Sequence, residues 1–330
     1  MRVTIIGCGA IGGWLAAGFA EGGAEVAVLA RGATLAALGS RGLVLRDGAA
    51  ERVFPLFASD VPAALPAADL LVLGLKGQDL PAALPAIRAL MGPGTRVLSA
   101  QNGVPWFFLQ GFGGPLEGAA LESVDPAGAL SATLPAGRVL AAVVHAAATV
   151  EAPGVVRLAK ADRLPVGDLG ANAALLAETV ALLRAGGVPA EPTGAIRQEI
   201  WRKLWGNSNM NPLSVLSRAT LSDMLDEPGV RGLAEAMMAE MDALGQRIGL
   251  APLGDIAARM AVTRRIGAFR TSMLQDWEAG RRLELGPILG ALVEMAERLG
   301  HKAPVMHGVH GLVRLLEQGS DRGRAERPEA

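Results

Sequence analysis

The first half of the chain alternates short apolar runs with stretches in which apolar residues recur every three or four positions. The short runs are typical of buried strands, and the longer stretches are typical of helices. This alternation predicts a mostly parallel sheet with helices on both faces. The predicted strands are Arg2–Gly7, Glu25–Ala30, Asp69–Leu75 and Thr95–Ser99, and the predicted helices are Ile11–Glu21, Ala33–Leu38, Leu80–Met91 and Ala173–Ala185.

A second group of strands interrupts the alternation. Gly42–Arg46 and Arg52–Phe57 flank an Asp-Gly pair at positions 47 and 48, and this arrangement predicts a hairpin. The remaining predicted strands are Arg138–Thr149, Gly154–Leu158 and Arg163–Val166.

Strand patterns end near Thr193, and only helical patterns follow. The predicted helices are Ala195–Trp205, Pro228–Ile248, Leu253–Arg265, Pro287–Leu299 and Pro304–Glu317. We therefore predict an α/β protein with a Rossmann-type doubly wound sheet in residues 1–193. An all-helical domain is expected in residues 194–318, and the polar residues 319–330 are expected to form a frayed tail.

Composition limits the possible functions. The chain has 330 residues, 51% of them hydrophobic and 19% charged, which excludes intrinsic disorder as its main state. The formal net charge is -1, so there is no overall basic field to attract nucleic acid or an anionic membrane. Composition therefore indicates neither nucleic acid nor a membrane as a partner.

Cysteine usage and the N-terminus both favour a cytoplasmic protein. Cys8 is the single cysteine of the chain and has no partner for an intramolecular disulfide. The uncharged stretch from Val3 to Ala20 is interrupted by glycines and begins as a strand, so we do not interpret it as a signal peptide. We expect no membrane span, because the uncharged runs contain polar residues and glycines.

Lysine is rare in this chain. Of the 31 basic residues only four are lysines, at positions 76, 160, 203 and 302. Arginine is therefore the default surface cation. A retained lysine is a candidate for a role that needs a titratable amine, which arginine cannot supply.

The residues that follow the first strand form a GxGxxG motif. In this motif the first glycine permits a tight turn, the second permits backbone approach to a pyrophosphate, and the third permits close helix–strand packing. The helix N-terminus then offers amides to the phosphates. A glycine-rich turn without a ligand is the alternative. We expect a dinucleotide to contact Gly7, Cys8, Gly9, Ala10, Ile11 and Gly12.

Arg31 follows the second strand, at the position where NAD-binding proteins usually carry an acid. An arginine there can bind the 2′-phosphate of NADP, so the sequence favours NADP over NAD. The alternative is an ordinary surface arginine.

Lys76 and Asn102 follow the strands Asp69–Leu75 and Thr95–Ser99. Ligands of doubly wound sheets bind outside the carboxyl ends of the strands, so both residues are candidates for the cofactor crevice. A solvated lysine and an Asn-Gly turn are the alternatives.

Lys203, Asn207 and Asn211 are spaced by four residues, which places them in one row if a helix continues. Pro212 disfavours helical structure at Asn211. Amides beside a lysine and two tryptophans suit neither a surface nor a core, and a polar substrate would provide their partners. A helix terminus capped by asparagines is the alternative.

A last polar segment contains Ser272, Asp276 and Glu284. Ser272 and Asp276 are candidate helix caps, and Glu284 precedes an apolar helix whose dipole it would complement. No histidine pattern indicates a metal site.

Together these motifs resemble the ketopantoate reductase (2-dehydropantoate 2-reductase) family. The resemblance runs through GCGAIG, the residues around Lys76 and Asn102, PGVVR at 153–157, EIWRKLWGNSNMNPLS and SMLQDWEAGRRLE. It implies reduction of a 2-keto acid by NADPH, with an N-terminal Rossmann domain, a helical C-terminal domain and an active site between them.

The resemblance also implies residue roles. Lys203 matches the general acid that protonates the carbonyl oxygen, and Glu284 matches the carboxylate that holds the substrate hydroxyl. Asn207, Asn211 and Ser272 match substrate-binding residues. The remaining matches are Asn102 and Lys76, near the nicotinamide and the substrate, and Arg31, at the cofactor phosphate.

Some positions depart from the family pattern. Many members have an acid where this chain has Gly286, an asparagine at Leu289 and a threonine at Leu283. The sequence therefore leaves open a different 2-keto acid as substrate. It also leaves open whether the aromatic and glycine-rich stretch 106–125 covers the active site or forms a homodimer contact.

A non-catalytic NADP(H)-sensing protein with the same fold is the alternative of another class. Lys203 and Glu284 together argue against it, because a sensor needs the glycine motif but no proton donor.

Overall fold

The computed structural model describes the backbone of residues 1–325 and the side chains of residues 1–319. Contacts divide the chain into two compact units. Unit 1 consists of Met1–Gln101 and Ala129–Glu199, and unit 2 consists of Asn102–Gly128 and the chain from Ile200 onward. The sequence suggested one boundary between 193 and 194. The contacts instead group residues 102–128 with the helices, and the second boundary lies inside a helix.

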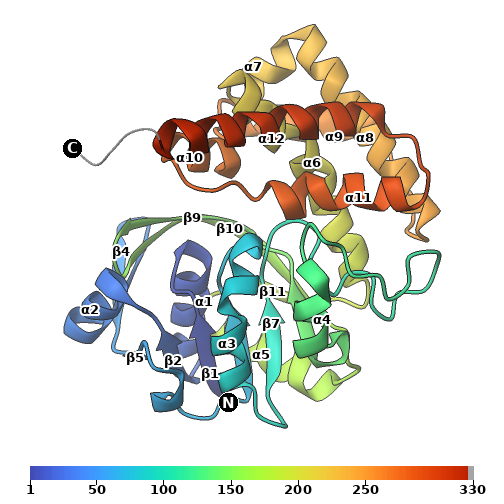
Figure 1. The fold of residues 1–330 in the computed structure, drawn as a ribbon. Coiled ribbons are helices and arrows are strands. Elements are labelled where there is room, and N and C mark those ends of the chain that lie inside the picture. The colour runs from blue at the N-terminus through green and yellow to red at the C-terminus, as the bar shows by residue number, and fades with distance from the viewer. Residues whose placement is uncertain (326–330) are drawn as a thin grey trace. The chain divides into compact units, whose positions relative to one another are not determined.

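Unit 1 is built on a parallel sheet whose central strand order is β7-β6-β1-β2-β5 (Figure 1). All four pairings in this series are parallel, as predicted from the alternation of strands and helices. The strands are β1 (Arg2–Ile6), β2 (Glu25–Leu29), β5 (Phe57–Ser59), β6 (Leu70–Leu73) and β7 (Arg96–Ser99). β5 was not predicted, because three residues are too few to show a period.

The helices of unit 1 confirm the sequence pattern. α1, α2, α3 and α5 lie where predicted, and α5 has the predicted bounds. α3 accommodates Pro85 in its interior. The helices are α1 (Ala10–Glu21), α2 (Gly32–Arg41), α3 (Leu80–Leu90), α4 (Ala129–Thr133) and α5 (Ala173–Ala185), with single 3-10 turns η1 (Pro62–Ala64), η2 (Gly77–Asp79) and η4 (Ala136–Arg138).

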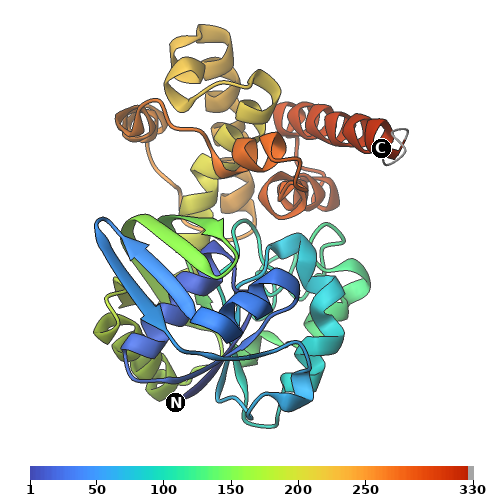
Figure 2. The ribbon, with the colours of Figure 1, turned by 90° about the vertical axis from the view of Figure 1, so that its left-hand side faces the viewer.

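The predicted hairpin is present as β3 (Leu43–Asp47) and β4 (Ala50–Phe54), which pair antiparallel. Gly48 in its turn has a φ of 57°, a left-handed conformation that favours glycine. β3 also pairs with the long strand β10 (Val155–Asp168), so the hairpin lies beside β9 and β10 (Figure 2).

Two strand predictions were wrong in this region. Arg138–Thr149 is not one strand but two, β8 (Val139–Ala142) and β9 (His145–Ala152), because β8 pairs with both β7 and β10 whereas β9 continues along β10 without pairing with β7. The predicted strands Gly154–Leu158 and Arg163–Val166 are both parts of β10, which continues through irregular pairing with β9. The short β11 (Ala190–Pro192) pairs with β10 and was not predicted.

Unit 2 is helical throughout its described part, apart from loops and turns. Its elements are the 3-10 turn η3 (Pro126–Gly128), α6 (Ile196–Ser217), α7 (Leu221–Asp226), α8 (Pro228–Arg247), α9 (Ile256–Ile266), α10 (Ser272–Glu278), the π-helical turn η5 (Gly286–Gly290), α11 (Ala291–Arg298) and α12 (Pro304–Ala325). The short helices α7 and α10 were not predicted. No helix among residues 1–325 is long and apolar enough to cross a membrane.

Two expectations about helix ends were wrong. α6 does not end near Trp205 but passes through Pro212 to Ser217, since burial of Leu213 and Val215 outweighs the hydrogen bond that proline cannot donate. The expected tail at 319–330 begins as helix, because α12 reaches Ala325. Residues 326–330 lie outside the described part of the chain.

Glycines allow α1 to approach the sheet at the end of β1. A Cβ on Gly12 would lie 1.9 Å from the carbonyl oxygen of Gly7, and a Cβ on Gly74 would lie 2.5 Å from the same atom. Real Cβ atoms do not approach a backbone oxygen so closely, so both positions require glycine. By contrast, a Cβ on Gly9 would meet no atom within 4 Å.

We therefore predict that Gly12→Ala lowers the free energy of unfolding by about 1–3 kcal/mol or more, because the added methyl group has no space. Gly9→Ala is the matched control. It should cost less than about 1 kcal/mol, since its methyl group enters open space at a helix N-cap. Urea unfolding of both variants measures the difference, and equal stabilities would contradict the packing described here.

Candidate active site

The loop between β1 and α1 has the geometry of a dinucleotide-binding turn. Gly7 has a φ of 89°, and Gly9 is the N-cap of α1 with open space over its Cα. No side chain caps this helix start, and its first turn carries no acid. Free amides and an open approach suit a phosphate group. The residues present therefore fit a dinucleotide at Gly7–Gly12.

Cys8 lies within this loop as a spacer and not as a nucleophile. Burial raises the pKa of its thiol to about 11, so the thiolate is scarce at neutral pH.

The other candidates of unit 1 follow the carboxyl ends of β2 and β6, the two strands that flank β1. Arg31 is exposed at the N-cap of α2, two residues after β2, and its guanidinium makes no hydrogen bond or ion pair with the described residues. Lys76 is the N-cap of η2, three residues after β6. Gln101, two residues after β7, links the ends of β7 and β6, because its amide donates to the carbonyl oxygens of Leu73 and Leu75.

Unit 2 brings three of the predicted residues together. The ammonium of Lys203 on α6 donates to Oδ1 of Asn102 over 2.5 Å, and Nδ2 of the same amide lies 3.5 Å from Oε2 of Glu284. The amide of Asn102 thus presents its acceptor to the cation and its donor to the carboxylate. Glu284 is only 6% exposed and begins the turn that leads into η5.

The surroundings of Lys203 change its titration. Burial lowers the pKa of the amine to about 8, and the negative charge of Glu284 opposes part of that shift. Such an amine is still mostly protonated at neutral pH, yet it releases its proton far more readily than a solvated lysine. The sequence could not decide which of the two effects dominates. In the structure, burial has the larger effect on the pKa of Lys203.

Asn207 and Asn211 extend the row that begins at Lys203, because α6 continues through Pro212. Their side-chain amides make no hydrogen bond to the described residues, although Asn211 is only 5% exposed. They are therefore available to a ligand. Asn209 is different, since its amide donates to the carbonyl oxygen of Trp205 and its role is structural.

Ser272 is exposed on the first turn of α10, and it is not the cap of that helix. Thr271 is the N-cap, and its hydroxyl accepts from the amide of Leu274 and contacts the hydroxyl of Ser214 on α6. Asp276 is not a cap either, because it pairs with Arg281 over 2.8 Å. Ser272 is thus free of a capping role. Its place in substrate binding stays a prediction.

The structure also shows what occupies the positions that depart from the family pattern. A Cβ on Gly286 would lie 2.6 Å from the carbonyl oxygen of Ser123, so the segment 102–128 fills this space. Leu289 is fully buried and Leu283 is 4% exposed. These three residues pack inside unit 2 and do not extend a polar surface.

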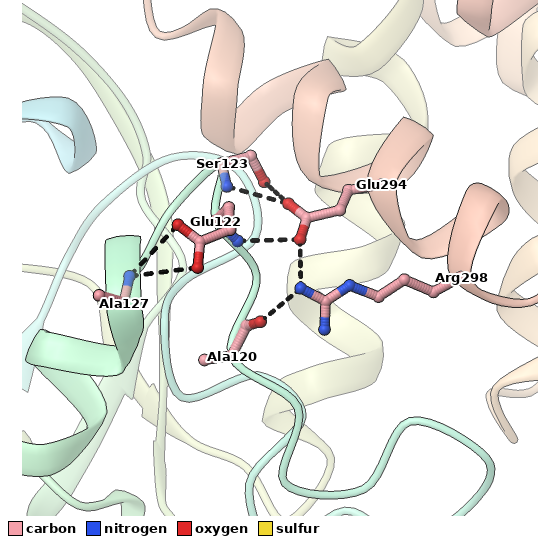
Figure 3. A network of polar contacts seen from close by, with 6 residues as sticks. All are labelled: Ala120, Glu122, Ser123, Ala127, Glu294 and Arg298. Atoms are coloured by element: carbon pink, nitrogen blue, oxygen red, sulfur yellow. Dashed lines mark hydrogen bonds and ion pairs between the residues drawn. The ribbon is translucent and has the colours of Figure 1, made fainter.

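Motif reasoning missed the polar residues that attach the segment 102–128 to α11. Glu294 accepts from Glu122 and from Ser123, and Arg298 donates to Glu294 and to Ala120 (Figure 3). A carboxylate and an arginine four residues apart on a helix indicate only a surface pair, so the sequence held no signal for this contact. No group of three metal-ligating side chains occurs in the described part of the chain.

Fold and site together define a protein with a dinucleotide-binding fold and a buried lysine amine. The family model described as "Ketopantoate reductase PanE/ApbA" matches residues 3–171, and the one described as "Ketopantoate reductase PanE/ApbA C terminal" matches residues 195–317. The chain belongs to the ketopantoate reductase family.

Individual relatives agree with the family. A 2-dehydropantoate 2-reductase of Mesorhizobium japonicum is 39% identical over 322 residues, which are 96% of this chain and 98% of the relative. A crystallised ketopantoate reductase candidate from Ralstonia solanacearum is 41% identical, with a TM-score of 0.91 over 97% of this chain and 98% of its own. A D-mandelate dehydrogenase, 21% identical with a TM-score of 0.81 over 97% of this chain and 100% of its own, shares the fold.

The cluster of Lys203, Asn102 and Glu284 gives a direct prediction. With only four lysines in the chain, the ¹³Cε resonances can be assigned one by one, and we expect the signal of Lys203 to titrate near pH 8. Glu284→Gln should lower that pKa further, because the charge that favours the ammonium is removed. The exposed Lys160 provides an internal reference. A Lys203 pKa near 10.5 would contradict the buried cluster.

Proposed function

We propose that this protein reduces 2-dehydropantoate (ketopantoate) to pantoate with NADPH, a step toward pantothenate and coenzyme A. Family membership supports the reaction class. The observation that carries the proposal is the amine of Lys203, held by Asn102 beside the buried Glu284 and with a pKa lowered to about 8. Carbonyl reduction requires the protein to supply a proton donor of this kind.

Lys203 acts as the general acid. When bound, NADPH supplies the hydride that adds to the carbonyl carbon. Negative charge then develops on the carbonyl oxygen, and the ammonium of Lys203 both stabilises this charge and donates the proton. Asn102 accepts a hydrogen bond from the ammonium and so holds the proton donor in place. After the proton transfer, the neutral amine regains a proton from water.

Glu284 has two roles in this proposal. Its charge keeps the pKa of Lys203 from falling below the working pH, so that the amine remains a proton donor. Its carboxylate also accepts a hydrogen bond from the substrate hydroxyl. Asn207, Asn211 and Ser272 bind the remaining polar groups of the keto acid, and two of these amides are unengaged within the described residues.

The contacts to the cofactor phosphates lie in unit 1 in this proposal. The loop Gly7–Gly12 binds the pyrophosphate through its amides, and Arg31 binds the 2′-phosphate. Lys76 and Asn102 contact the nicotinamide side of the cofactor. The absence of an acid after β2 supports NADPH over NADH, since that acid would repel the 2′-phosphate.

Ketopantoate is favoured over a bulkier or more polar keto acid. The departures from the family pattern at Gly286 and Leu289 suggested a changed substrate pocket. However, the segment 102–128 fills the space beside Gly286, and the side chain of Leu289 is buried. At both positions, a residue that packs within unit 2 stands where many family members have a polar residue. No observation therefore favours a second substrate class.

A homodimer in the cytoplasm completes the proposal. A ketopantoate reductase from Staphylococcus aureus with the same fold is described as dimeric, and it is 20% identical with a TM-score of 0.73 over 97% of this chain and 100% of its own. A single cysteine supports a reducing compartment.

A steady-state assay with ketopantoate and NADPH tests the reaction, and Lys203→Arg tests the general acid. We expect turnover by the wild type and a loss of about 10²- to 10⁴-fold in kcat for Lys203→Arg, because arginine keeps the charge but does not release its proton. No turnover by the wild type would overturn the proposal. Near-normal kcat in Lys203→Arg would reduce the lysine to a fixed charge.

The cofactor assignment is tested by Arg31→Ala. We expect the KM for NADPH to rise about tenfold or more while the KM for NADH stays unchanged, since only NADPH carries the phosphate that Arg31 binds. Arg265→Ala, at an exposed arginine of α9, is the matched control and should change neither value. A parallel rise for both cofactors would argue against a 2′-phosphate contact.

A further inference from the structure

Asn102 belongs to a segment that has no helix or strand of its own before η3. Residues 102–125 form bends and turns, and their backbone groups are paired partly within the segment and partly with residues of the neighbouring helices of unit 2. The position of the Asn102 amide against Lys203 and Glu284 therefore depends on how this segment is attached.

The first attachment lies beside Asn102. The amide of Val104 donates to the carbonyl oxygen of Pro287 over 2.7 Å. Gly103 has a φ of 82°, and a Cβ there would lie 2.4 Å from the same oxygen. The segment thus lies directly on the turn that begins with Glu284.

The second attachment is the Glu294 clamp, which we define as Ala120, Glu122, Ser123, Glu294 and Arg298 (Figure 3). The carboxylate of Glu294 accepts from the amides of Glu122 and Ser123 over 2.9 Å each and from the Ser123 hydroxyl over 2.8 Å. Arg298 donates to Glu294 over 2.5 Å and to the carbonyl oxygen of Ala120 over 2.7 Å.

The charge of Glu294 is maintained in this position. Burial alone would raise its pKa, but the hydrogen bonds from Ser123 and Glu122 and the one from Arg298 lower it below the ordinary value. The clamp therefore consists of charge-assisted hydrogen bonds at neutral pH, which are stronger than neutral ones.

Ser123 connects the Glu294 clamp to the turn that carries Glu284. Its amide and hydroxyl are held by Glu294, while its carbonyl oxygen lies against Gly286, two residues after Glu284. Gly286 precedes Pro287, which accepts from Val104. Glu294 is thus connected both to the turn that carries Glu284 and to the residues that follow Asn102, although it lies ten residues after Glu284 in the sequence.

We propose that Glu294 is a positioning residue for the reduction: through Ser123 it fixes Asn102 and Glu284 in the geometry that orients the amine of Lys203. The inference rests on the proposed function, because it concerns the same proton transfer. Glu294 itself touches none of the reacting groups.

A double-mutant cycle in kcat tests this inference. We expect Glu294→Gln to lower kcat about tenfold or more without changing the KM for NADPH, since a small misplacement of a catalytic group has effects of this size. In an Asn102→Ala background the same substitution should lower kcat by a clearly smaller factor, because one of the two groups that it positions is already gone. Ser123→Ala is a milder second variant, and Glu297→Gln, an exposed acid on the same helix, is the control.

Two outcomes would overturn the inference. Equal losses in the wild-type and Asn102→Ala backgrounds would show that Glu294 acts independently of Asn102. A lowered melting temperature with unchanged kcat in Glu294→Gln and Ser123→Ala would show a purely structural role. Wild-type turnover of ketopantoate is measured in the same series, so failure of the proposed function is seen separately as an inactive parent enzyme.

Discussion

The site depends on a balance at one nitrogen atom. Burial disfavours the charged form of Lys203, whereas the charge of Glu284 favours it, and the result is a pKa of about 8. Without burial the amine would hold its proton too tightly to be a good acid at neutral pH. Without Glu284 its pKa would be lower still, and less of the amine would carry the charge that stabilises a developing oxyanion. Asn102 contributes a neutral hydrogen-bond partner that holds the amine without adding charge.

This balance requires three segments that are far apart in the sequence. Lys203 is on α6, Glu284 begins the turn before η5, and Asn102 begins an irregular segment between two elements of the sheet unit. All three belong to unit 2, while the glycine loop and Arg31 belong to unit 1. The fold therefore separates the residues for proton transfer from those for the cofactor phosphates. The irregular segment is held by backbone contacts at Pro287 and by the carboxylate of Glu294.

Much of the fold and several site residues could be predicted from the sequence, because their signals are local. The GxGxxG loop, the strand ends at Lys76 and Arg31 and the spacing of Lys203 and Asn207 all depend on neighbours along the chain. The split between β8 and β9 was missed because it reflects a change of pairing partner, which an apolar run does not record. The helix through Pro212 was missed because its stability comes from tertiary burial.

The role of the segment 102–128 shows the same limit. Its glycines and aromatics suggested a cover of the active site or a dimer contact, and both stay predictions; its attachment to the helical unit was not foreseen. Gly286 and Leu289 appeared to change the substrate pocket, but Gly286 is required by the carbonyl oxygen of Ser123. Packing between residues that are distant in the sequence, such as Ser123 against Gly286, becomes visible only in the structure.

The central claim is that the ammonium of Lys203 gives its proton during carbonyl reduction. The most direct test is the rate of hydride transfer to ketopantoate, followed in single turnovers by NADPH absorbance, as a function of pH. The account predicts a rate that is constant below neutrality and falls tenfold per pH unit above about pH 8, as the amine loses its proton. A rate that stays constant to pH 10 would contradict it.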